Sequence, residues 1–133
     1  MSAVFADTFY FLAIANPRDK AHAKCLAFSQ ASDQPVITTT WVLMEVGDAL
    51  CQGADRVVFS LLLEDLDQDA ESTVLTASQG LFDKAVALFA TRPDKEWSLT
   101  DCTSFVVMQE QGLTEVLTSD HHFRQAGFIT LLK

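Results

Sequence analysis

The sequence predicts an α/β fold in three layers, α/β/α, around a central, mainly parallel sheet of four to five strands. Three observations lead to this prediction. Short apolar runs alternate with longer segments of helical periodicity along the whole chain. A helix after each strand makes consecutive strands parallel and covers both faces of the sheet. The 133 residues contain no linker or repeat that would divide them, so we expect a single domain over residues 1–133.

The first half of the chain is expected to form two strands and four helices. The strands are the apolar run at 3–6 and the segment 35–38. The helices are expected at 8–15, 21–31, 40–51 and 55–66. The helix at 21–31 is expected to bury Ala23, Leu26, Ala27 and, at its edge, Gln30. In the helix at 40–51, apolar residues recur at helical spacing at Val42, Leu43, Val46, Ala49 and Leu50.

The second half is expected to add three strands and three helices. The strands are expected at 72–75, 115–118 and, at the edge of the sheet, 128–131. Ser78 is a suitable cap for a helix that buries Leu81, Ala85, Leu88 and Phe89. A helix at 98–111 is expected to bury Phe105, Val106 and Met108, and a short helix begins at His121.

The charge balance argues against a protein that holds nucleic acid by charge alone. Eighteen Asp and Glu oppose nine Lys and Arg, which gives a formal net charge of −9. The few cations, Arg18, Lys20, Lys24, Arg56 and Arg124, form no obvious basic groove in the sequence. Clustered carboxylates that hold a metal ion remain compatible with this composition, because the cation reverses the local charge.

Cysteine usage and hydropathy predict a cytoplasmic protein with no membrane association. The three cysteines, Cys25, Cys51 and Cys102, have no C-x-x-C spacing, which favours a reducing cytosol over a disulfide framework or zinc knuckle. The apolar residues 3–15 lack a preceding cation and are interrupted by Asp7, so we do not expect a signal peptide. No apolar run is long enough to span a bilayer.

Four acids occupy corresponding ends of the predicted elements. Asp7 follows the first strand and Asp120 follows the fourth, at the carboxyl edge where parallel sheets bind ligands. Glu45 lies about one turn into the helix after the second strand, and Asp101 lies in the first turn of its helix. If the helices pack in the usual way, the four carboxylates converge. Such carboxylates repel one another, and Mg²⁺ or Mn²⁺ would relieve the repulsion.

Each acid also has a purely structural interpretation. Asp7 and Asp120 are possible helix N-caps, Asp101 is a possible partner of the helix dipole, and Glu45 is a possible solvated side chain. Taken together, these interpretations do not explain why all four acids occupy the same kind of position.

The segments around the four acids have a distinctive composition. Residues 4–8 read VFADT, residues 39–46 read TTWVLMEV, residues 98–105 read SLTDCTSF, and residues 117–128 read LTSDHHFRQAGF. In this order and over the full length they resemble the PIN-domain family, and within it the VapC-like toxin ribonucleases. The last two motifs are specific, and the first is weak when taken alone.

The resemblance implies a metal-dependent endoribonuclease of a type II toxin–antitoxin pair. It makes Asp7, Glu45, Asp101 and Asp120 catalytic metal ligands, with Mg²⁺ or Mn²⁺ as cofactor. It makes Thr8 and Ser104 hydroxyls that orient carboxylates or water. Metal-activated water, rather than the 2′-hydroxyl, would attack the phosphodiester of the RNA substrate.

Partners are implied by the resemblance as well. A small antitoxin protein would hold the toxin, and a homodimer is expected, with apolar side chains near Phe9 to Phe11 as possible support. His121 and His122 suggest general bases or ligands, although packing or helix-start hydrogen bonding is the favoured interpretation of His122. Trp41 and Trp97 are possible stacking residues for bases, but core or interface packing is favoured.

Three alternatives remain for comparison. A receiver domain needs an Asp at the end of its third strand, where this chain has Thr76 and Ala77. A haloacid-dehalogenase-type phosphatase needs Asp-x-Asp-x-Thr after its first strand, which the chain lacks. The serious alternative is a catalytically silent PIN-like module that binds RNA or a protein.

Overall fold

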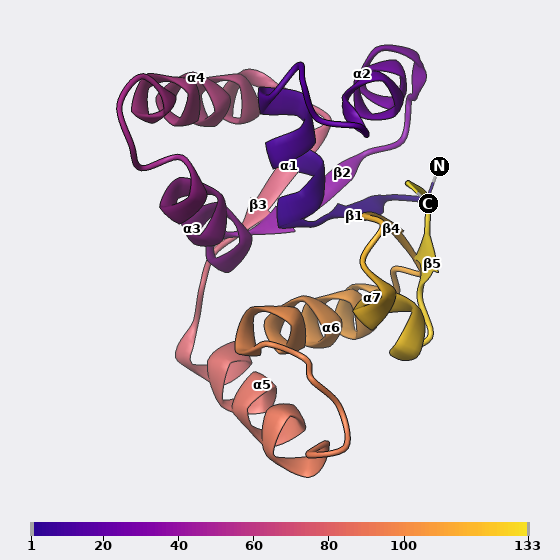
Figure 1. Ribbon diagram of the computed structural model, residues 1–133. Coiled ribbons are helices and arrows are strands. Elements are labelled where there is room, and N and C mark those ends of the chain that lie inside the picture. Colours follow the sequence, from indigo (N-terminus) through magenta and orange to yellow (C-terminus); the bar gives the residue numbers. More distant parts are fainter. Residues whose placement is uncertain (1, 133) are drawn as a thin grey trace.

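The computed structural model describes residues 2–132 as one parallel sheet covered by helices (Figure 1). The strands are β1 Val4–Ala6, β2 Val36–Thr39, β3 Ser72–Leu75, β4 Glu115–Leu117 and β5 Ile129–Thr130. The helices are α1 Thr8–Ala15, α2 His22–Ala31, α3 Thr40–Ala49, α4 Asp55–Gln68, α5 Gln79–Thr91, α6 Leu99–Gln111 and α7 His121–Gln125. Each predicted strand and helix is confirmed, with ends that move by up to two residues. The sheet is parallel at every pairing.

The strand order β3-β2-β1-β4-β5 places β1 at the centre. The chain runs outward from β1 through β2 to β3, then returns to β4 on the other side of β1. The order therefore reverses between β1 and β4, where a parallel sheet opens a crevice at its carboxyl edge. All three residues of β1 are fully buried, as a strand covered on both faces requires.

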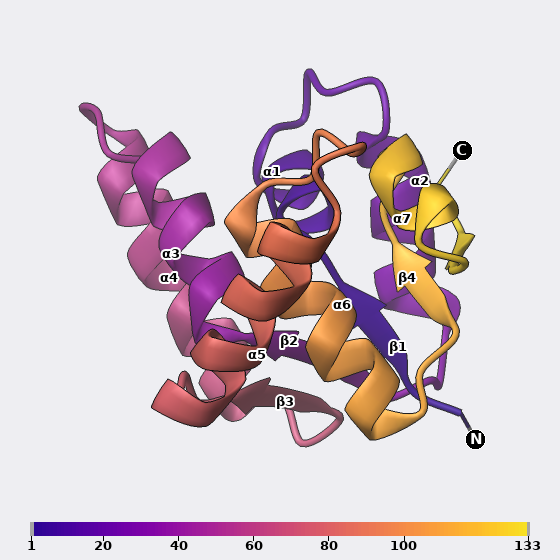
Figure 2. The same ribbon diagram turned by 90° about the horizontal axis from the view of Figure 1, so that it is seen from below.

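The three layers are visible in two views. Helices α1, α2 and α4 lie on one side of the sheet, and α5 and α6 lie on the other (Figure 1). Figure 2 looks at the molecule from the side of α5 and α6, with β1 and β2 behind them. The helix α6 is the most buried of all, with an unbroken buried run from Cys102 to Met108, because it lies between the sheet and α5.

Phe105 is the centre of an aromatic cluster on the α6 side of the sheet. Its ring lies 4.9 Å from that of Trp97, 5.0 Å from that of Phe123 and 5.8 Å from that of Phe128, measured between centroids. The Trp97 and Phe123 contacts are edge-to-face, the arrangement that aromatic pairs prefer. The cluster ties α6 to α7 and to the last strand, so it fixes the elements that carry Asp101 and Asp120.

The predicted buried face of α2 is wrong. Leu26 is 38% exposed, and Ala23 and Ala27 are exposed as well. The helix instead buries Cys25 and half-buries Phe28, whose ring meets that of Tyr10 edge-on at 6.3 Å. The periodicity alone did not determine the face because α2 contacts the rest of the fold mainly through α1.

Three further burial predictions are wrong. Phe89 was expected inside but is 50% exposed, because α5 is an outer layer that packs on α6 through Ala85 and its neighbours. Ala49 is exposed at the end of α3. The apolar side chains near Phe9 to Phe11 are not a free surface, since Tyr10 and Phe11 are buried and Phe9 is half-buried.

Among residues 2–132, no helix combines the length and apolarity needed to cross a membrane. Trp97 is buried, in agreement with the packing role favoured for it.

A pair of phenylalanine substitutions tests the layer assignment. We expect Phe105→Ala to lower the free energy of unfolding by about 3–5 kcal/mol, because it empties a fully packed aromatic site. The matched Phe89→Ala should cost about 1 kcal/mol or less, because that ring is half in solvent. Urea unfolding measures both, and equal losses in the two variants would contradict the burial described here.

Candidate active site

The carboxylate of Asp7 is buried at the crevice between β1 and β4. Asp7 is only 6% exposed and occupies the N-cap position of α1, yet its side chain makes no capping hydrogen bond. Its Oδ2 instead accepts a hydrogen bond from Thr118 Oγ1 at 3.1 Å, across from the end of β4. The interpretation of Asp7 as a helix cap is therefore wrong, and its burial calls for another explanation.

Burial raises the pKa of Asp7 to about 7, well above its ordinary value of 3.8. The negative charges of Asp101 and Glu45 raise this pKa further, while hydrogen bonds from the Thr8 backbone and the Thr118 hydroxyl lower it. Both of these charges belong to carboxylates, one on α6 and one on α3. Two of the other three predicted acids, Asp101 and Glu45, thus lie close enough to Asp7 to affect its ionisation.

Glu45 of α3 is held by Thr8 of α1. The Thr8 hydroxyl donates a short hydrogen bond to Glu45 Oε1, between residues 37 positions apart in the chain. Glu45 is half-buried and Thr8 is buried. Glu45 is therefore not simply a solvated helix residue, and Thr8 makes the carboxylate contact that the sequence predicted for it.

Asp101 is both a helix cap and a member of the acidic cluster. It forms a capping box with Ser98: the Asp101 backbone N–H donates to Ser98 Oγ at 3.0 Å, and the Ser98 backbone N–H donates to Asp101 Oδ2 at 3.1 Å. The same Oδ2 lies 3.0 Å from His122 Nδ1 of α7. Asp101 thus has a structural role, as the N3 residue of a capping box rather than the helix-dipole partner that the sequence suggested, and this role does not exclude a second one.

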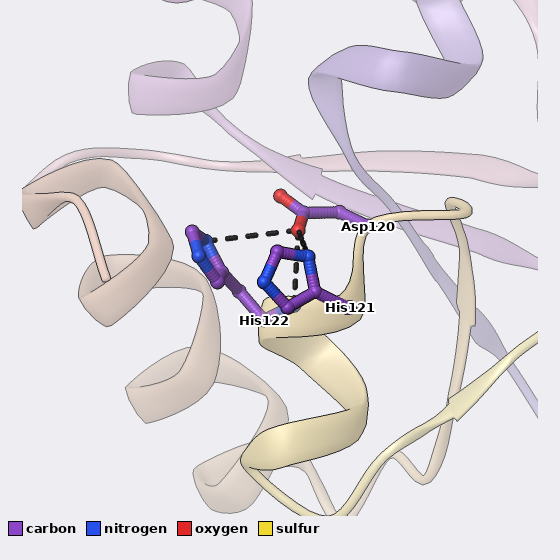
Figure 3. A group of neighbouring side chains, drawn as sticks. All are labelled: Asp120, His121 and His122. Carbon is purple, nitrogen blue, oxygen red and sulfur yellow. Dashed lines mark hydrogen bonds and ion pairs between the residues drawn. The ribbon is translucent and has the colours of Figure 1, made fainter. Parts of the chain in front are cut away.

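Asp120 is the N-cap of α7, as its structural interpretation predicted. Its Oδ1 accepts the backbone N–H of His122 at 2.9 Å and lies 3.6 Å from both His121 Nδ1 and His122 Nδ1 (Figure 3). Its own backbone N–H donates to Thr118 Oγ1 at 3.1 Å. Thr118 therefore connects Asp120 to Asp7, since the same hydroxyl donates to the Asp7 carboxylate.

The four acids form two linked groups rather than one tight ring. Glu45 and Asp101 each act electrostatically on Asp7, and His122 lies between Asp101 and Asp120. Within residues 2–132, one group of three candidate metal ligands has all its ligand atoms within 4.8 Å of one another. This group is Asp120, His121 and His122.

Two expectations from the sequence concern Ser104 and His122. The Ser104 hydroxyl is buried in α6 and contacts no carboxylate among the described residues, so of its two predicted contacts the one to water stays a prediction. Packing or helix-start hydrogen bonding was the favoured interpretation of His122, and its backbone N–H does donate to the N-cap Asp120. Its ring nitrogen in addition lies near two acids. The available signal was the D-x-H spacing, which places the imidazole in the helical turn that Asp120 caps.

Comparison with known proteins agrees with this geometry. The model of the PIN domain family matches residues 4–129, which is nearly the whole chain.

The chain belongs to the PIN domain family.

Similar proteins cover the full length of this PIN domain. It is 27% identical over 137 aligned positions to proteins of two Mycobacterium tuberculosis strains named 23S rRNA-specific endonuclease VapC20, covering 95% of each chain. The crystal structure of Mycobacterium tuberculosis VapC20, titled a Sarcin-Ricin loop cleaving toxin, matches with a TM-score of 0.87 and 22% identity over 98% of this chain and all of the other. FitAcB from Neisseria gonorrhoeae matches with a TM-score of 0.67 and 14% identity, over 98% and 96%. The two structures show the shared fold.

The pKa of Asp7 predicts an unusual pH dependence of stability in the absence of divalent metal. The unfolded chain ionises Asp7 near 3.8 and the folded chain near 7, so folding is penalised increasingly as pH rises between these values. Asp7→Asn has no ionisation, so it should be as stable as wild type near pH 4 and more stable above pH 7. The shift sets an upper limit on this gain of about 4 kcal/mol, as an order of magnitude.

Chemical unfolding with chelator across this pH range measures the effect. The exposed Asp48→Asn is the matched control and should follow wild type at each pH. A difference in unfolding free energy between wild type and Asp7→Asn that stays constant with pH would contradict the buried, proton-binding state of Asp7.

Proposed function

We propose that this PIN domain is a divalent-metal-dependent endoribonuclease, the toxin of a type II toxin–antitoxin pair. The observation that carries the proposal is the buried Asp7, at the crevice between β1 and β4, under the charges of Asp101 and Glu45. A purely structural protein gains nothing from burying a carboxylate beside two others. The family, and relatives named as endonucleases, support the same reaction class.

The residues present fit a hard divalent cation. We assign Asp7, Glu45, Asp101 and Asp120 as its ligands, direct or through water, because Mg²⁺ and Mn²⁺ bind to carboxylate oxygens. Burial, together with the negative charges of Asp101 and Glu45, raises the pKa of Asp7, and a bound cation would offset the cost of ionising this carboxyl group. When bound, the metal would activate a water and stabilise the charge on the phosphate.

The neighbouring side chains hold the ligands in place. Thr8 orients Glu45, Thr118 joins Asp7 to Asp120, and His122 spans Asp101 and Asp120. These contacts join helices α1, α3, α6 and α7 and the segment that follows β4, so they fix the carboxylates before any substrate arrives. The reaction would be hydrolysis of an RNA phosphodiester by water, without the 2′-hydroxyl as nucleophile.

The alternative is a PIN domain that binds RNA or a protein without cleaving. Two features favour the enzyme: all four acids are present, and Asp7 retains an energetically costly burial. A small antitoxin partner, a homodimer and a cytoplasmic location are part of the proposal. The dimer no longer has support from residues 9–11, since most of these side chains are covered.

Cleavage of an RNA panel tests the proposal directly. We expect Mn²⁺ or Mg²⁺ to support cleavage by wild type and a chelator to abolish it. Asp7→Asn and Asp101→Asn should each lose about a hundredfold or more in rate, the scale of losing one electrostatic group in a catalytic site. Asp48→Asn should retain wild-type activity. Equal rates for wild type, both active-site variants and the chelated protein would refute a metal-dependent mechanism.

Thermal stability provides a second test that needs no RNA. Ligand binding to the folded state alone stabilises it, by about 2.7 kcal/mol at a concentration one hundred times Kd. We therefore expect Mn²⁺ to raise the Tm of wild type but not that of Asp7→Asn. Because Mn²⁺ competes with the proton on Asp7, the rise should be larger at pH 8 than at pH 6. A rise of the same size in Asp7→Asn would place the metal elsewhere.

A further inference from the structure

We propose that the hollow lined by Arg18, Lys20 and Lys24 binds the phosphate backbone of single-stranded RNA beside the carboxylates. The inference rests on the proposed function and adds to it the surface that holds the substrate. An acidic nuclease needs such a surface, because a chain with a net charge of −9 repels RNA.

The fold gathers cations that are dispersed in the rest of the sequence. An open hollow of about 640 Å³ is lined by all three cations, together with Phe9 and Ser119. Three of the nine Lys and Arg residues thus share one concave surface. Arg124 does not line the hollow but lies near it, since its Nη1 donates to the backbone carbonyl of Ser119 at 3.4 Å.

The hollow adjoins the carboxylates through the chain itself. Ser119 immediately precedes Asp120, and Phe9 follows Thr8, the residue that holds Glu45. The lining therefore includes the first turn of α1, which follows β1, and the segment that follows β4. A backbone phosphate in the hollow would place a neighbouring part of the same strand at the acids.

Local hydrogen bonds hold the loop that carries Arg18 and Lys20 and the start of α2, the helix that carries Lys24. The Arg18 backbone N–H donates to Asn16 Oδ1 at 3.0 Å, and Asp19 Oδ1 accepts the Ala21 N–H at 2.8 Å. His22 Nδ1 lies 2.8 Å from the carbonyl oxygen of Ala13, which ties the start of α2 to α1. Asp19 also lines the hollow, so three cationic side chains and one acidic side chain share its lining.

The chain has a strongly acidic stretch at residues 64–71, and none of its acids lines this hollow. Asp65, Asp69 and Glu71 line a different one, between α1, α2 and α4. The half-buried Phe9 adds an aromatic surface on which a base can stack. The combination of cations and an aromatic ring is the usual composition of a single-strand binding surface.

Two triple variants with the same net charge test the proposal. The first is Arg18→Gln, Lys20→Gln, Lys24→Gln. The matched control is Arg56→Gln, Lys84→Gln, Lys95→Gln, which removes three cations that do not line the hollow. Both are three units more negative than wild type, so a difference between them measures position rather than net charge.

Binding is measured by fluorescence anisotropy of a labelled oligouridine, with chelator present to prevent cleavage. Loss of three phosphate contacts should reduce the slope of log K against log[salt] by about 2 for a single strand. We expect the first variant to show this change and to bind more than tenfold more weakly at low salt, while the control stays close to wild type. Equal weakening in both variants, no weakening in either, or no binding by wild type at low salt would overturn the proposal.

The same proteins separate this inference from the proposed catalysis. If wild type binds oligouridine through the hollow but cleaves no RNA with Mn²⁺, the binding surface stands and the catalytic proposal fails. If Mn²⁺-dependent cleavage is normal and the first triple variant binds and cleaves like the control, the catalytic proposal stands and the hollow is not the RNA surface. An acidic protein partner that binds wild type but not the first variant, while RNA affinity is unchanged in that variant, would reassign the hollow.

Discussion

The burial of the Asp7 carboxylate is the constraint on which the candidate site depends. Asp7 follows the central strand β1, which is covered on both faces, so its side chain cannot avoid the protein interior. Its hydrogen-bond partners are the Thr8 backbone and the hydroxyl of Thr118, which follows the neighbouring strand β4. Because Asp101 and Glu45 add further negative charge, the site has a strong affinity for positive charge before any ligand is considered.

The rest of the structure supports this arrangement. The aromatic cluster around Phe105 fixes α6 relative to α7, and thereby Asp101 relative to Asp120 and His122. On the other side of the sheet, Thr8 fixes α1 against α3 through Glu45. The site is therefore held by the two helical layers together, and the acids are ordered by contacts that do not depend on a metal.

The sequence predicted the strand ends and the position of Asp7 well, because alternation of apolar runs determines a parallel sheet and its carboxyl edge. The helix faces were harder. The exposure of Phe89 depends on α5 being an outer layer, and the face of α2 depends on its contact with α1, which no local pattern encodes. Likewise, the contact of His122 with two acids depends on the orientation of α7, and the shared hollow of Arg18 and Lys24 depends on the path of a loop.

The capping hydrogen bonds give the four acids unequal value as evidence of activity. Asp101 belongs to a capping box and Asp120 caps α7, so a PIN domain that had lost catalysis would still gain stability by keeping them. Asp7 caps nothing, and its burial is a cost to the fold. A chain freed from catalysis would therefore be expected to lose the acid at the end of β1 first. Asp7 is thus the single residue whose presence best distinguishes an active nuclease from a catalytically silent relative.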